Sequence, residues 1–174
     1  MADILDIVND NDQVIGKASR DYIHKNVLMH RGVIVWVVNS KGELAVEKRA
    51  THRLYFPGYY DVSVGGQVES GESYEAAAER ELKEELGLNG RLHLISSYDE
   101  FSPQHKEKRR IYVCCSEGPF KPENREMKTV RFLSKDKIQR MMDKKEAEFT
   151  PDFRIAFEKY LESEAKQGFL CAIS

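Results

Sequence analysis

The stretch from Gly32 to Val38 constrains the fold more than any other part of this chain. After the glycine it reads Val33-Ile34-Val35-Trp36-Val37-Val38, a continuous run of bulky and mostly β-branched side chains. Such a run is typical of a strand that is buried on both faces, because a strand with one face in water alternates apolar with polar residues. A sheet built around this strand therefore needs cover on both faces.

Predicted strands and helices alternate along the rest of the chain. A hairpin around an Asx-rich turn and a lead-in occupy residues 1–30. Further strands are predicted at 43–49, 61–64, 111–115 and 129–133, and helices at 73–86, 134–142 and 150–165. Interleaved elements predict one α+β domain over residues 1–174, an α/β/α sandwich with a mixed β-sheet between helices.

Charge and hydropathy exclude several classes of protein. With 27 basic and 29 acidic side chains, the net charge of −2 argues against a general nucleic-acid binder, which is usually basic. The acidic start, Met1 to Asp6, differs from a signal peptide, and the longest apolar run is too short to cross a bilayer. We therefore expect a cytoplasmic protein with no membrane and no nucleic-acid partner.

The cysteines and histidines show no familiar metal-binding or disulfide pattern. Of three cysteines, Cys114 and Cys115 are adjacent and should point to opposite faces of a strand, so we expect both to be packing thiols. Neither a CxxC nor an HxxxH spacing occurs, so no zinc site is expected.

One face of the helix predicted at 73–86 carries three carboxylates. Glu81, Glu84 and Glu85 fall within an arc of about 100° and span about 6 Å along the helix axis. The neighbouring Arg80 and Lys83 are expected to point elsewhere, so the carboxylates would repel one another. A solvated face is one interpretation. Because the glycine-rich loop before the helix permits close approach of a ligand, a site for Mg²⁺ or Mn²⁺ is the other.

These residues belong to a longer pattern with a known counterpart. Gly66, Glu72, Arg80-Glu81-Leu82, Glu84-Glu85 and Gly87-Leu88 match the nine specified positions of G-x5-E-x7-R-E-U-x-E-E-x-G-U, where U is aliphatic. The segment from Gly66 to Leu88 therefore resembles the signature box of the Nudix hydrolase family. The resemblance implies a Nudix-type sandwich fold and a single Nudix hydrolase domain.

The resemblance also implies an activity and roles for individual residues. A Mg²⁺-dependent enzyme, with Mn²⁺ as a possible substitute, would cleave the pyrophosphate bond of a nucleoside diphosphate linked to another moiety, by attack of a metal-activated water on phosphorus. Glu72 and Arg80 would form an ion pair that fixes the loop to the helix. Metal ligands would be Gly66, Glu81, Glu84 and Glu85; the catalytic base would be Glu81, Glu85 or Glu126.

Positively charged groups elsewhere are candidates for holding the small-molecule substrate. Arg49 follows a predicted strand, and Arg109 lies in the basic run before another; either could bind phosphate, although an exposed charged loop is the simpler interpretation of each. The N-terminal hairpin could also pair edge to edge with a second copy, giving a homodimer.

Two other functions remain open at this point. The chain also resembles type I isopentenyl diphosphate isomerases, in the segments 39–44 and 56–61 and in His24 and His30. However, Gly65 stands where the isomerases' catalytic cysteine is expected, so we interpret both histidines as packing or solvent contacts. The last alternative is a non-catalytic domain that binds nucleotides.

Overall fold

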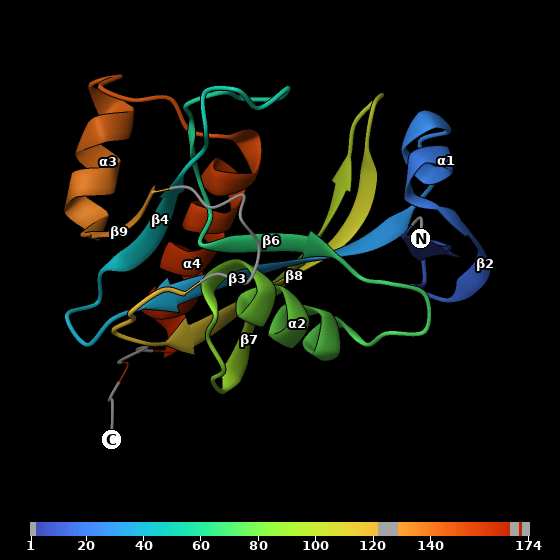
Figure 1. Cartoon of the computed structure of the whole chain (residues 1–174), viewed down its shortest axis with the longest axis horizontal. Helices are drawn as coiled ribbons and strands as arrows, with labels where there is room; N and C mark the ends of the chain where they lie inside the picture. Colours follow the sequence, from blue (N-terminus) through green and yellow to red (C-terminus); the bar gives the residue numbers. More distant parts are fainter. Residues whose placement is uncertain (1–2, 122–128, 168–170, 172–174) are drawn as a thin grey trace.

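The computed structural model describes residues 3–121, 129–167 and 171, and is built on a seven-stranded mixed sheet with a separate N-terminal hairpin (Figure 1). The hairpin consists of β1 (Ile4–Val8) and β2 (Val14–Ser19). The strands of the main sheet are β3 (His30–Val38), β4 (Leu44–Lys48), β5 (Tyr60–Asp61), β6 (Val64–Gln67), β7 (Leu92–Phe101), β8 (Lys106–Cys115) and β9 (Thr129–Leu133). The helices are α1 (Arg20–Lys25), α2 (Tyr74–Leu86), α3 (Lys135–Asp143) and α4 (Pro151–Gln167).

The strand β3 lies at the centre of the sheet, as its composition predicts. It pairs antiparallel with β4 and β6 and parallel with β8, whose other edge pairs with β7. Strands β5 and β9 pair with β4. The β3–β8 register runs from His30 opposite Glu107 to Val38 opposite Cys115, so it brings polar residues together at the start of both strands.

The two faces of β3 belong to two separate cores. Ile34, Trp36 and Val38 pack with α3 and α4, whereas Val33, Val35 and Val37 pack with α2. Figure 1 shows α2 and α4 on opposite faces of the sheet. The prediction of a mixed sheet between helices in an α/β/α sandwich is therefore confirmed.

The helix α2 has a clear sequence basis at both ends and along its buried face. The Ser73 side chain accepts a hydrogen bond from the Ala76 amide at the first turn, and Gly87 ends the helix at φ 65°. Ala77, Ala78 and Leu82 are buried against the sheet. This packing fixes the rotation of the helix, and therefore the direction in which its carboxylates point.

Two strand predictions near the site were wrong. The strand expected at 61–64 is the end of β5 and the start of β6, because Val62 and Ser63 interrupt the ladder. The basic run 106–110, expected as a loop, belongs to β8 and pairs on both sides, while its partner β7 was not predicted. Charged side chains occupy this end of both strands, so their sequences lack the apolar run that predicts a buried strand.

The cysteine prediction was half right. Cys114 is a buried free thiol, but Cys115 forms a disulfide with Cys171, 56 positions away along the chain. This pairing depends on the position of α4 in the fold, so the spacing of the cysteines along the sequence does not reveal it.

At the hairpin, Val14 and Ile15 of β2 are more than half exposed, and pairing of two copies there stays a prediction. None of the helices in the described ranges has the combination of length and apolar character needed to cross a bilayer.

Candidate active site

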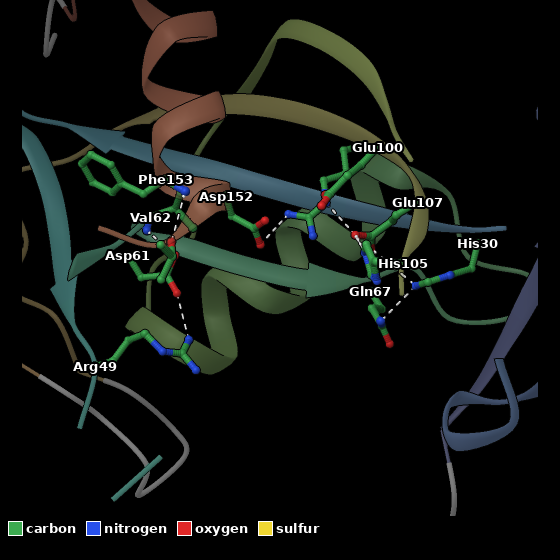
Figure 2. A network of polar contacts seen from close by, with 12 residues as sticks. His30, Arg49, Asp61, Val62, Gln67, Glu100, His105, Glu107, Asp152 and Phe153 are labelled. Atoms are coloured by element: carbon green, nitrogen blue, oxygen red, sulfur yellow. Dashed lines mark hydrogen bonds and ion pairs between the residues drawn. The ribbon is translucent and has the colours of Figure 1, made fainter. Parts of the chain in front are cut away.

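A polar cleft of about 730 Å³ lies over β6, beside the carboxylate face of α2. Glu81, Glu84 and Glu85 line it. Arg49 and Arg109 also line it, as does His105 in the turn between β7 and β8. Figure 2 shows the polar network along it, with Arg49 and Asp61 at one end and His30 and Gln67 at the other. The fold therefore brings acidic, basic and imidazole groups into one space.

Gly66 and Glu81 fit closely together at the wall of the cleft. A β-carbon added to Gly66 would overlap the Glu81 carboxyl group, so only glycine leaves room for that carboxylate. Gly66 belongs to β6 and pairs with Val33 of β3, which holds its backbone in place. The proposed carbonyl ligand and the first proposed carboxylate ligand are therefore adjacent.

Arg80 holds the loop before α2 onto the helix. Its Nε donates to Glu72 Oε1 at 3.0 Å, its Nη2 donates to Glu72 Oε2 at 3.0 Å and to the Gln67 carbonyl at 2.9 Å, and its Nη1 donates to Glu81 Oε1 at 2.8 Å. Nη1 also lies 3.7 Å from Glu84. The expectation that Arg80 points away from the carboxylates was therefore wrong, because its long side chain reaches back across the helix.

The charges of Arg80 and Glu81 depend on burial and on the hydrogen bonds that Arg80 makes. Hydrogen bonding to Glu72 raises the pKa of Arg80 above its usual range, so Arg80 stays charged. Burial raises the pKa of Glu81, and the hydrogen bond from Arg80 opposes that change. Glu72, Glu81 and Glu84 share the one guanidinium of Arg80, so this set of three carboxylates carries net negative charge, which favours a cation.

The donor set fits a hard divalent cation. Glu81, Glu84 and Glu85 offer carboxylate oxygens on one wall of the cleft, and the backbone of Gly66 lies directly against the Glu81 carboxylate. Oxygen donors of this kind suit Mg²⁺ or Mn²⁺.

Of the two arginines proposed for substrate, both line the cleft, but each already has partners. Arg49 donates to Asp61 at 2.8 Å and to the Tyr55 carbonyl at 3.1 Å. Arg109 is 12 % exposed and contacts the carboxylates of Glu107, Asp152 and Glu100 at 2.6, 2.8 and 3.3 Å. A substrate phosphate would therefore compete with carboxylates at both positions. Glu126, the third proposal for the base, lies outside the described residues.

A group of imidazoles at the other end of the cleft was missed by the sequence reasoning. His24 and His30, expected as packing or solvent contacts, lie beside His105, and His30, His105 and Glu107 are close enough to hold a metal ion. No local spacing could have revealed them, because the parallel pairing of β3 with β8 places His30 opposite Glu107.

Comparison with known proteins places this geometry in a family. Residues 28–153 match the family model of the NUDIX domain. An uncharacterized Nudix hydrolase of Escherichia coli strain K12, YfcD, is 32% identical over 165 residues, which cover 93% of this chain and 88% of that protein. A second one, SCO1686 of Streptomyces coelicolor, is 48% identical over 88 residues, covering 51% of this chain and 49% of that protein.

Solved structures show the same fold. The crystal structure of DR0079 from Deinococcus radiodurans superposes with a TM-score of 0.73 at 28% identity, covering 90% of this chain and 99% of that one. The NUDIX domain of Shewanella oneidensis NrtR, solved in complex with ADP ribose, has a TM-score of 0.57 at 13% identity, and covers 76% of this chain and 86% of that one.

Proposed function

The chain belongs to the Nudix hydrolase family, and we propose that it cleaves the pyrophosphate bond of a nucleoside diphosphate linked to another moiety, using Mg²⁺. The observation that carries the proposal is the set Glu81, Glu84 and Glu85 on one wall of a polar cleft, with Gly66 against Glu81. Nudix hydrolases generally use a divalent metal, and this oxygen donor set is the kind that such an ion requires.

In this mechanism the protein supplies position and charge. Glu81, Glu84 and Glu85, with the Gly66 carbonyl, would hold the ion, which when bound supplies a Lewis acid for the phosphate oxygens and for the attacking water. Arg80 keeps Glu81 in place through the 2.8 Å hydrogen bond and ties the loop to α2 through Glu72. A carboxylate must also take a proton from the attacking water, and Glu81, Glu85 and Glu126 are the three proposals for that base.

The phosphates would lie between the carboxylates and the basic side of the cleft. Arg49, directly after β4, and Arg109, on β8, both line this space, so either could bind a phosphate oxygen by giving up a carboxylate partner. The ADP ribose bound by the NrtR domain supports a nucleotide derivative as the substrate class.

A hydrolysis screen of Glu85→Gln against wild type tests the proposal. Nucleoside di- and triphosphates, nucleotide sugars, dinucleotides and coenzyme A are incubated with Mg²⁺ or Mn²⁺, and release of a monophosphate or of pyrophosphate is measured. Loss of a catalytic acid or base typically costs about 10²–10⁴-fold in rate, so Glu85→Gln should lose at least about 100-fold while keeping its circular dichroism spectrum.

The matched control is Glu79→Gln, an exposed glutamate on the same helix that does not line the cleft. It removes the same charge from α2 and should leave the rate unchanged. Wild-type protein that binds nucleotides tightly but hydrolyses none of these compounds at saturating metal would contradict the proposal and support the non-catalytic alternative.

The isomerase alternative lacks its nucleophile in this structure. Among the described residues no cysteine lines the cleft, and the free thiol of Cys114 is buried in the core on the α2 side. Isomerisation of isopentenyl diphosphate without hydrolysis of any pyrophosphate would reverse the order of the two activities.

A further inference from the structure

The N-terminal hairpin contacts the loop that joins β6 to α2, residues 68–73, which we call the site loop. Figure 1 shows the chain passing beside the hairpin on its way from β6 to α2. The Ser70 amide donates to the Ile4 carbonyl at 2.8 Å, and Leu5 forms a β-bridge with Glu69. The backbone pairing of β1 therefore extends onto the site loop.

A buried carboxylate on β1 holds the same loop with its side chain. Asp6 is 8% exposed, and its Oδ1 accepts from Ser70 Oγ at 2.7 Å while its Oδ2 accepts from the Gly71 amide at 3.1 Å. Gly71 has a φ of 84°, so the loop turns sharply at the point that Asp6 holds. Burying a carboxylate is costly unless its oxygens are hydrogen-bonded, and both oxygens of Asp6 bond to the site loop.

Hydrogen bonds connect the site loop to the carboxylates of α2. The Glu69 amide donates to Glu72 Oε2 at 3.1 Å, so the position of the loop backbone determines where the Glu72 carboxylate lies. Arg80 donates to both oxygens of Glu72 and to Glu81. A shift of the loop would therefore move Arg80 and, through it, the first of the proposed carboxylate ligands.

The turn of the hairpin is fixed to the start of α2. Tyr74, the first residue of the helix, is 6% exposed, and its hydroxyl lies 3.2 Å from each carboxylate oxygen of Asp12. Arg31 of β3 donates to Asp12 at 2.6 Å, and the guanidinium carbon of Arg110 on β8 lies 3.9 Å from the centre of the Tyr74 ring. The hairpin is thus anchored to the sheet and to both the loop and the helix that form the site.

We propose that the N-terminal hairpin positions the metal-binding face of α2, and that Asp6 is the positioning residue. Asp6 does not line the cleft, so it acts through the site loop, Glu72 and Arg80. The hairpin lies before residues 28–153, which match the NUDIX domain, so it is a support that this chain adds to that domain. The inference rests on the proposed function, because that function assigns a divalent ion to the carboxylates of α2.

Mn²⁺ binding and amide hydrogen exchange test this proposal on the full chain without substrate. The Kd for Mn²⁺ is measured from the electron paramagnetic resonance signal of the free ion. Asp6→Ala should raise this Kd by about tenfold, the lower end of the 10–100-fold loss typical of residues that support metal ligands, because Asp6 acts through two further side chains. In the metal-free protein, the Gly71 amide should exchange at least about tenfold faster, since it loses a hydrogen bond to a charged group.

Three further variants separate positioning from a general loss of stability. In Asp6→Asn, the amide can accept from the Gly71 backbone and donate to Ser70 Oγ, so this variant should bind Mn²⁺ as wild type does. Asp10→Ala removes an exposed carboxylate from the same hairpin, outside the cleft, and should change neither measurement. Ser70→Ala removes one bond to Asp6 at a partly exposed position and gives the same test should Asp6→Ala not fold, which urea unfolding checks.

Unchanged exchange at Gly71 in Asp6→Ala, or a Kd equal to that of Asp10→Ala, would overturn the proposal. Equal weakening of Mn²⁺ binding in Asp6→Asn and Asp6→Ala would also overturn it, because the effect would then come from charge rather than from the hydrogen bonds. These results are independent of hydrolysis: wild type that binds Mn²⁺ but hydrolyses nothing would contradict the proposed function alone, and an active enzyme with unaltered Asp6→Ala would contradict the positioning role alone.

Discussion

The ion pairs of Arg80 give a prediction whose size follows from the structure. Arg80→Met removes the guanidinium and keeps much of the aliphatic bulk, leaving Glu72 and Glu81, 16% and 14% exposed, without their cation. Removing one partner of a buried charge pair costs about 3–5 kcal/mol. Because the Arg80 side chain is 25% exposed and water screens part of that cost, we expect about 2–3 kcal/mol here.

Urea and thermal unfolding measure this change. For a chain of 174 residues, each kcal/mol corresponds to about 2–4 °C in Tm, so Arg80→Met should melt about 4–12 °C below wild type. Lys83→Met is the control, since Lys83 is exposed on the same helix and its charge near the helix end is worth less than about 1 kcal/mol.

A double-mutant cycle isolates the contact itself. Glu72→Gln, Arg80→Met and the double variant should show a coupling of at least about 1 kcal/mol, as expected for residues in direct contact. Additive effects, or an Arg80→Met protein as stable as Lys83→Met, would show that this ion pair does not fix the loop to α2.

Two further predictions concern Gly66 and the disulfide. Gly66→Ala should lower hydrolysis by about 100-fold, because displacing a catalytic group by about 1 Å can cost that much; Gly65→Ala, whose β-carbon would meet Val62 Cγ2 at an ordinary 3.5 Å, should retain activity. Equal rates in the two variants, measured on the same substrate, would refute this close fit. Cys171→Ser should lower the free energy of unfolding by up to about 4 kcal/mol, from the loop entropy of a 56-residue separation. Thiol titration of denatured wild type should find one free cysteine, and three would contradict the bond.

Local sequence patterns are enough to predict the layers of the fold and the carboxylate face of the site. The apolar run of β3 requires cover on both faces, and its alternating side chains enter two cores. In α2, spacing of 3.6 residues per turn puts Glu81, Glu84 and Glu85 on one face wherever the helix lies. Local periodicity carries such information because it depends only on neighbouring residues.

The groups that face those carboxylates follow from long-range contacts, which no local pattern predicts. The approach of Arg80 to Glu81, the carboxylates around Arg109 and the Cys115–Cys171 bond depend on side-chain reach and on chain paths. The histidine group depends on a parallel register that joins residues 77 positions apart, His30 and Glu107. Charged residues in β8 resemble a solvated loop in the sequence, and they are buried because partners from other strands and from α4 neutralise them.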